Sequence, residues 1–206
     1  RVLMKALYDF IISPKNKNRY NNVKKVGDKD LIVNTEIFNH QHVNREAIVK
    51  AIPLAYNTPI EVGDTVLVHH NIFRRWHDMK GRERNSKGYY KENMYFADVS
   101  QIYLYKKHNE EVYTKKWQCI KGYCFVQPLM NEDQFSVEKE VPLQGVVKYT
   151  DGTVKIDEVI GFLPGHEFEF VVDGQRLYRI KSNRITIKYG HKGNQEEYNP
   201  SWAQSS

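Results

Sequence analysis

The chain has 206 residues, of which 40% are hydrophobic, and this excludes a disordered tail because it is enough to build one or two folded domains. Its 31 basic and 25 acidic residues give a net charge of +6, but the two signs are mixed along the chain, so the balance only weakly indicates nucleic-acid binding. No apolar run approaches the roughly 18 to 20 residues needed to cross a bilayer, so we expect a soluble protein with no membrane partner.

Short strand-like segments recur along the chain between Gly, Asn, Asp and Pro residues. Fourteen Tyr and nine Phe residues lie among Val and Ile runs, and such side chains pack well on pleated surfaces. The predicted strands are 8–13, 47–52, 65–69, 94–97 and 102–106, followed by 123–127, 144–149, 159–163, 167–172, 177–180 and 185–189. No stretch shows a helical stripe, so the sequence predicts an all-β protein whose strands close into barrels.

The two series of strands repeat one order of segments. Residues 8–14 (YDFIISP) match 122–128 (GYCFVQP), and each is a strand that ends at Pro. Residues 47–50 (AIVK) match 145–148 (GVVK), and residues 62–68 (VGDTVLV) match 156–162 (IDEVIGF) more loosely. The spacing of Tyr95, Ile102 and Leu104 recurs in Tyr178, Ile185 and Ile187. Chance similarity is the alternative, but the preserved order favours two copies of one barrel. We predict barrels at 1–107 and 117–190, joined by the polar stretch 108–116, and a C-terminal tail at 191–206 that either docks on a neighbouring barrel or stays loose.

The order of these motifs resembles the GroES family of co-chaperonins. A Pro-ended first strand, a loop, a returning strand, the turn VGDTVLV and a late Y…I.I.Y strand follow one another. In the second copy the closing part spans 167–190, where Asp173-Gly174 is predicted to make a hairpin turn. The resemblance covers residues 4–190, rests on order and spacing, and is nearer to a diverged, tandem, phage-type member than to the compact bacterial one.

This resemblance implies two tandem GroES-like β-barrels joined by a short linker. It also implies a non-enzymatic protein without a cofactor, which forms a ring-shaped homo-oligomer and acts as a lid on a GroEL-like chaperonin that folds proteins with ATP. A virus-encoded member would work in the cytoplasm of the host cell. The alternative is a viral structural or assembly protein that uses the same barrels to make rings without a chaperonin.

The resemblance also implies a docking loop between the first two strands. Residues 15–30 (KNKNRYNNVKKVGDKD) are polar, and Leu31, Ile32 and Val33 follow at once. Burial of such side chains contributes about 1.5 to 3 kcal/mol each, and several copies in a ring would add avidity. We expect these three residues to contact the apical domains of the chaperonin; the alternative is that they form another core strand.

The second copy has a shorter connection at 129–143, with Phe135 and Val137 as isolated apolar residues. We therefore predict that only the first barrel docks on the chaperonin.

An insertion at 71–93 (NIFRRWHDMKGRERNSKGYYKEN) distinguishes the first copy from compact family members. It carries a possible basic and aromatic surface formed by Arg74, Arg75, Trp76, Arg82 and Arg84. Basic side chains interleaved with aromatic ones can follow a phosphate backbone and stack on bases. The alternative is a solvated hairpin whose aromatic residues cover the barrel. A single patch without a groove motif is weak evidence, so we do not expect nucleic acid as the partner.

Catalytic and metal sites carry recognisable residue patterns. The sequence contains no nucleophile elbow, P-loop, dinucleotide fingerprint or paired catalytic carboxylates, so we predict no enzymatic activity. The adjacent His69 and His70 are expected on opposite faces of a strand, which predicts no shared metal. Cys119 and Cys124 are interpreted as free thiols, which fits a reducing cytoplasmic compartment.

Overall fold

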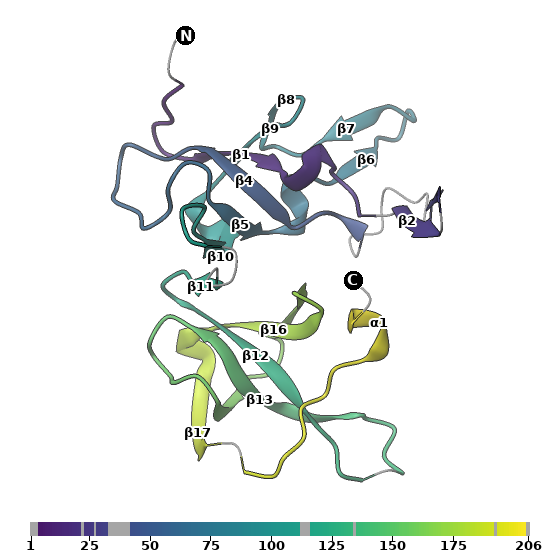
Figure 1. Cartoon of the computed structure of the whole chain (residues 1–206), viewed down its shortest axis with the longest axis vertical. Helices are drawn as coiled ribbons and strands as arrows, with labels where there is room; N and C mark the ends of the chain where they lie inside the picture. Colours follow the sequence, from purple (N-terminus) through teal and green to yellow (C-terminus); the bar gives the residue numbers. More distant parts are fainter. Residues whose placement is uncertain are drawn as a thin grey trace. The chain divides into compact units, whose positions relative to one another are not determined.

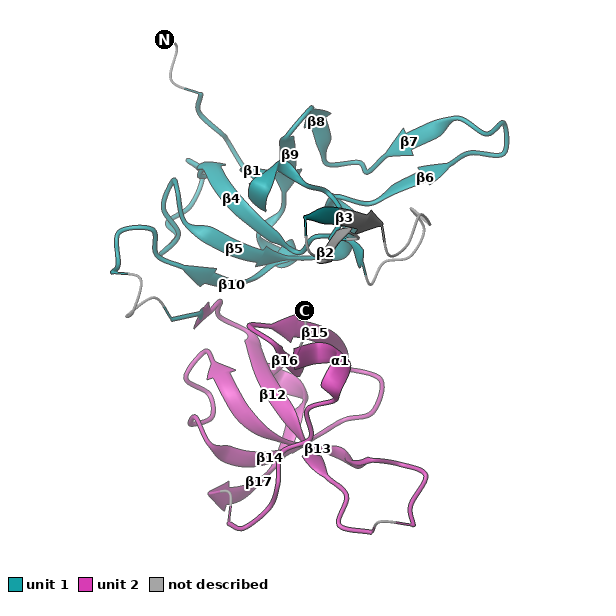
Figure 2. Ribbon diagram, turned by 45° about the vertical axis from the view of Figure 1, so that its right-hand side comes forward, with its two compact units in different colours: residues 1–117 teal, residues 118–206 magenta. Residues whose placement is uncertain are grey.

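The computed structural model describes residues 4–21, 23–26, 28–32, 42–111, 116–133, 135–191 and 193–204 (Figure 1). The chain divides into two compact units, unit 1 at Arg1–Trp117 and unit 2 at Gln118–Ser206 (Figure 2). Apart from short 3-10 turns and the four-residue helix α1 (Ser201–Gln204), the regular structure is β-strand. The predicted all-β class is therefore confirmed. Among the described residues, no helix is long and apolar enough to span a membrane.

Unit 1 is built on an antiparallel sheet. Its strands are β1 (Phe10–Pro14), β4 (Glu46–Ala51), β5 (Thr65–Val68), β8 (Tyr89–Lys91), β9 (Met94–Ala97) and β10 (Ile102–Lys106), in the order β10-β5-β4-β1-β9-β8. Two separate hairpins are β2 (Val23–Val26) with β3 (Lys29–Ile32), and β6 (Arg75–His77) with β7 (Glu83–Asn85). Single 3-10 turns lie at η1 (Lys15–Lys17), η3 (His70–Ile72) and η4 (Val99–Gln101).

Unit 2 is also an antiparallel sheet, preceded by the short strand β11 (Gln118–Cys119). Its strands are β12 (Tyr123–Met130), β13 (Glu140–Thr150), β14 (Glu158–Phe162), β15 (Phe168–Val172), β16 (Gln175–Lys181) and β17 (Ile185–His191), in the order β15-β16-β12-β13-β14-β17. The 3-10 turn η5 (Ser182–Arg184) connects β16 to β17.

Pro14 and Pro128 were both predicted to end a strand, and this is right for Pro14 but wrong for Pro128. Pro14 is the last residue of β1, whereas Pro128 lies inside β12. The β12–β13 pairing slips between Pro128 and Met130. A proline, which has no N–H to donate, is tolerated in a strand at such an irregularity.

The two units share one strand order. Read from one edge, unit 1 is β10-β5-β4-β1-β9-β8 and unit 2 is β17-β14-β13-β12-β16-β15. The turns before β5 and β14 also match, because Gly63 N donates to Val49 O at 2.9 Å and Asp157 N donates to Val147 O at 2.9 Å. Gly63 and Asp157 both have positive φ, at 97° and 64°. The repeat read from the sequence is therefore also a repeat of strand order and turn geometry.

Each unit has its own apolar core, formed by the strands that the sequence pattern places inside. Strand β4 alternates, with Ala47, Val49 and Ala51 buried, while all five residues of the central strand β1 are buried. The unit 2 core contains Cys124, Val126, Val147, Val154, Ile160, Phe162 and Ile180. Burial of a Val, Leu, Ile or Phe side chain contributes about 1.5 to 3 kcal/mol, so these residues favour the folded state most strongly.

Candidate functional site

The predicted docking residues lie in the long connection between β1 and β4, residues 15–45, which we call the excursion. Leu31 and Ile32 belong to β3, whose described partner is β2, with Lys24 opposite Leu31 and Val23 opposite Ile32. This hairpin is a two-stranded sheet of its own and does not extend the main sheet of unit 1. Val33 lies outside the described residues. The excursion therefore carries a regular hairpin that is separate from the main sheet of unit 1.

The two ends of the excursion are held together by Asn44, whose side chain is almost completely buried. Its Nδ2 donates to the carbonyl oxygens of Lys15 at 3.1 Å and Asn18 at 2.8 Å, and its backbone N donates to Arg19 O at 2.9 Å. Its Oδ1 accepts a hydrogen bond from Glu46 N at 2.9 Å. One amide side chain thus satisfies backbone groups on both sides, and this fixes where the excursion leaves and rejoins the sheet.

The insertion at 71–93 packs against this base. Arg19 Nε donates to Phe73 O at 3.0 Å, and its Nη1 donates to Asn85 Oδ1 at 2.8 Å. Tyr20 accepts a hydrogen bond on its hydroxyl from Arg75 N at 2.8 Å. Burial lowers the pKa of Arg19, although an arginine remains charged at any physiological pH. The insertion therefore braces the base of the excursion through side chains of residues 19 and 20.

The possible basic and aromatic surface is brought together on the β6–β7 hairpin, but much of its charge is paired there. Arg75 lies 3.3 Å from Glu83, and Arg84 lies 2.9 Å from Asp78. The Nε atom of Arg74 is buried and has no hydrogen-bond partner within the described residues. The other two predicted residues, Trp76 and Arg82, are exposed, Trp76 on β6 and Arg82 on the connection to β7. A face on which arginines alternate with paired carboxylates is poorly suited to follow a phosphate backbone.

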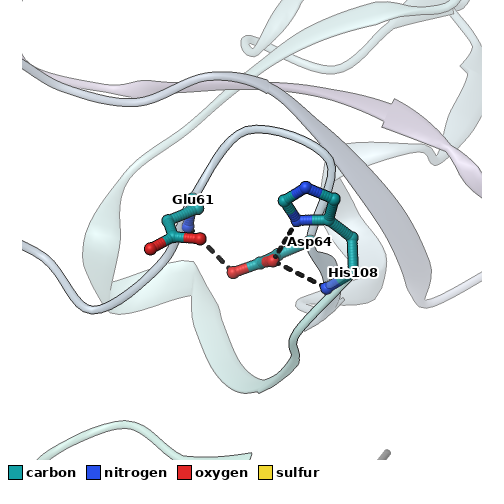
Figure 3. Close-up of side chains that lie close together, drawn as sticks. All are labelled: Glu61, Asp64 and His108. Carbon is teal, nitrogen blue, oxygen red and sulfur yellow. Dashed lines mark hydrogen bonds and ion pairs between the residues drawn. The ribbon is translucent and has the colours of Figure 1, made fainter. Parts of the chain in front are cut away.

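A buried carboxylate, Asp64, lies in the turn before β5 (Figure 3). It accepts hydrogen bonds from Glu61 N at 2.8 Å, from His108 N at 3.0 Å and from the His108 ring at 3.0 Å. Burial alone would raise the pKa of Asp64, but hydrogen bonds from His108, Glu61 and Lys107 outweigh it and lower the pKa. Asp64 therefore ties the turn at 61–64 to the end of β10.

The ligand atoms of Glu61, Asp64 and His108 lie within 4.8 Å of one another, which is a spacing that a metal ion could use. A cation already occupies this space, because Lys107 Nζ lies 3.3 Å from Asp64 and 3.5 Å from Glu61. The same amine donates to Pro59 O. We therefore interpret the cluster as structural: it holds the turn at 61–64 against the end of β10.

The expected arrangement of His69 and His70 on opposite faces of a strand is wrong. Strand β5 ends at Val68, and His69 caps the turn η3, with its Nδ1 accepting from Asn71 N at 3.1 Å. The two imidazole rings stack with their centroids 4.4 Å apart. The sequence pattern fails here because the period of two no longer holds once the strand has ended.

Sequence reasoning missed a groove of about 510 Å³ on unit 2. It is lined by Glu138, Lys139, Glu140, Val141, Pro142, Leu143, Gln144, Phe162, Glu167, Glu169, Arg176, Tyr178, Tyr198, Pro200 and Trp202. The last three belong to the segment expected to dock on a neighbour or stay loose. That segment instead packs on its own unit, since Tyr198 N donates to Pro128 O at 2.8 Å and Asn199 Nδ2 donates to Gly174 O at 3.0 Å.

The groove has a rigid polar wall centred on Arg176. Its guanidinium lies 2.6 Å from Glu140 and 2.7 Å from Glu169, and the Tyr178 hydroxyl donates to Glu140 at 2.5 Å. Burial alone would lower the pKa of Arg176, but the two carboxylates outweigh it and raise the pKa. The pKa of Tyr178 is raised by burial and by its hydrogen bond to Glu140. These groups hold one another in fixed positions beside the aromatic lining.

Comparison with known proteins finds no family model, no curated protein and no solved structure that matches this chain. Two features of the molecule bear on its function: the braced excursion of unit 1 and the groove of unit 2.

Proposed function

We propose that this chain is a co-chaperonin of the GroES-like kind, built from two tandem β-barrels. It forms a ring-shaped lid on a chaperonin, docks through Leu31, Ile32 and Val33, and has no catalytic activity of its own. The ATP chemistry belongs to the chaperonin. The repeated strand order of the two units supports the tandem architecture, and the order of sequence motifs supports the family.

The observation that carries the proposal is the braced excursion of unit 1. A docking element must leave the sheet, stay anchored at its base, and offer apolar side chains to a partner. The base is anchored by Asn44 and by Arg19, and the hairpin above it carries Leu31 and Ile32 outside the main sheet. Each contact is small and reversible, and several copies in a ring make the combined docking strong.

The described residues of unit 2 form no equivalent excursion. In the corresponding place β12 and β13 remain paired as far as Met130 and Glu140, and residues 131–139 close a short loop. Phe135 and Val137 are nearly fully exposed on that loop, at 97% and 95%. We therefore assign docking to unit 1 alone, and these two residues provide a matched control.

The test is ATP-dependent association of the full chain with a purified GroEL-type chaperonin, measured by co-sedimentation. Three proteins are compared: the natural chain, a variant with Leu31→Ser, Ile32→Ser and Val33→Ser, and a control with Phe135→Ser and Val137→Ser. Loss of three aliphatic contacts per subunit is expected to abolish detectable binding because the effect is multiplied around the ring.

The expected result is binding by the natural chain and by the control, and none by the triple variant. Equal binding by all three would overturn the assigned residues. No binding by any of them, while rings still form, would overturn the co-chaperonin function and favour an assembly protein.

A further inference from the structure

The two units carry opposite net charges. Unit 1 has 21 Lys and Arg residues against 13 Asp and Glu residues, a net charge of +8, whereas unit 2 has 10 against 12, a net charge of −2. Charge of opposite sign on two surfaces favours their encounter and suppresses contacts between like surfaces. Copies of this chain are thus electrostatically suited to meet with unit 1 of one copy against unit 2 of another.

On unit 1 the β6–β7 finger, residues 75–85, extends away from the rest of the unit (Figure 2). At its tip Met79 is fully exposed, and the side chains of Lys80 and Arg82 beside it are also exposed. An exposed apolar side chain that precedes two cations in the turn contributes nothing to the core of its own unit.

The tip is rigid because Asp78 organises it. One carboxylate oxygen of Asp78 accepts from Lys80 N and from Arg82 N, each at 2.9 Å, and the other accepts from Arg84 Nε at 3.0 Å. Gly81 adopts the positive φ of 72° that the turn needs and donates its N–H to Asp78 O at 2.9 Å. A preformed tip loses little conformational entropy when it binds, which favours docking by a small contact.

The groove of unit 2 is complementary to this tip in both polarity and charge. Its lining includes four carboxylates against two cations, Lys139 and Arg176. Arg176 pairs with Glu140 and Glu169, and Glu138 and Glu167 are the carboxylates outside that pairing. Trp202, 51% exposed, stands in the aromatic part of the lining. A methionine side chain packs favourably against aromatic rings, and the flanking cations would lie near the acidic rim.

We propose that the tip of the β6–β7 finger of one copy docks in the unit 2 groove of a second copy. The contact is heterologous, because finger and groove are different surfaces, and a heterologous contact that repeats with a closing rotation gives a ring. This inference rests on the proposed function, because the contact is the interface between subunits of the proposed ring. A single contact of this size is weak, since stable interfaces bury about 1,200 to 2,000 Å², so closure of the ring supplies the stability.

The test compares charge-reversal variants of the full chain by sedimentation velocity. The measurements are made without chaperonin, over a range of protein concentrations in low-salt buffer. The finger variant carries Lys80→Glu and Arg82→Glu, and the groove variant carries Glu138→Lys and Glu167→Lys. A control variant with Lys50→Glu and Lys87→Glu makes the same change in net charge at exposed positions of unit 1 outside the tip. Circular dichroism checks that all of them fold.

The natural chain and the control are expected to self-associate. The finger variant and the groove variant alone should each need about tenfold higher concentration or more, because like charges then face each other. An equimolar mixture of the two should regain association, since the acidic finger now meets a basic groove and the basic finger an acidic one. A monomeric natural chain, unchanged variants, or a mixture that stays apart would each overturn the contact.

The proposed function can fail separately. Self-association without chaperonin binding would refute the co-chaperonin function alone. Chaperonin binding by rings that the finger and groove variants leave unchanged would refute this contact alone.

Discussion

Removal of the Asp64 carboxylate should destabilise unit 1 strongly. In Asp64→Ala two backbone N–H groups, those of Glu61 and His108, lose their acceptor, and Lys107 loses a partner 3.3 Å away. A hydrogen bond to a charged group contributes about 1.5 to 3 kcal/mol, and Asp64 is completely buried. We expect the free energy of unfolding to fall by about 3 kcal/mol for the two backbone bonds.

The measurement is urea unfolding followed by tryptophan fluorescence, because Trp117 is buried in unit 1 and reports its unfolding. Glu61→Ala is the matched control, since that carboxylate is exposed and its ion pair with Lys107, at 3.5 Å, is expected to contribute less than about 1 kcal/mol. Asp64→Asn should give an intermediate loss. An Asp64→Ala variant as stable as the Glu61→Ala control would refute this structural role of Asp64.

The same residue predicts a pH dependence. The pKa of Asp64 is lower in the folded chain than its ordinary value of about 3.9. The folded state therefore binds the proton less tightly than the unfolded state, and the stabilisation is fully present above pH about 4. It is lost as the pH falls through the folded pKa. The stability difference between the natural chain and Asp64→Asn should be constant from neutral pH down to about 5 and should shrink below about 4; a difference that grows on acidification would contradict this.

Three further outcomes follow from buried polar groups. Asn44→Ala should cost about 1 to 3 kcal/mol and speed amide exchange at the two ends of the excursion, measured by mass spectrometry, while exchange in unit 2 stays unchanged. Arg176→Ala should lower the melting temperature of unit 2, because the two carboxylates of Glu140 and Glu169 lose a largely buried partner; an unchanged melting temperature would show the groove wall to be dispensable. Cys124, completely buried and with its pKa raised by burial to about 12, should resist alkylation at pH 8 in the folded chain and react fully in urea.

Each predicted strand corresponds to an observed strand to within a few residues, but β2, β3, β6, β7, β8 and β11 were not predicted. The segments at 94–97 and 102–106 coincide with β9 and β10, because their apolar pattern is short and dense and Asn93 and Asp98 bound the first of them. The end of β12 was misplaced, since a proline usually ends a central strand and only the pairing with β13 reveals the irregularity that tolerates Pro128.

The groove of unit 2 could not be predicted, because no local pattern contains it. Its walls come from the start of β13, from β15 and β16, and from the C-terminal segment, which are far apart in the sequence. The aromatic character of Trp202 was visible, but its location depended on hydrogen bonds such as Tyr198 N to Pro128 O that form only after folding. Tertiary contacts, not propensity, decide such sites.

The long excursion and the long insertion occur in the same unit, and their contacts explain why. In unit 2 the corresponding connections, 131–139 and 163–167, are both short. In unit 1, Arg19 and Tyr20 at the base of the excursion bind backbone and side-chain groups of the insertion, at Phe73, Asn85 and Arg75. An excursion of this length needs a second surface to fix its base, because a single sheet edge satisfies too few of its backbone groups. Within the insertion, the Phe73 ring packs edge-on against Tyr95 with their centroids 4.9 Å apart, and the Arg75 guanidinium lies 5.4 Å from the centroid of the Tyr20 ring. These two side chains therefore have a structural role that does not require a nucleic acid.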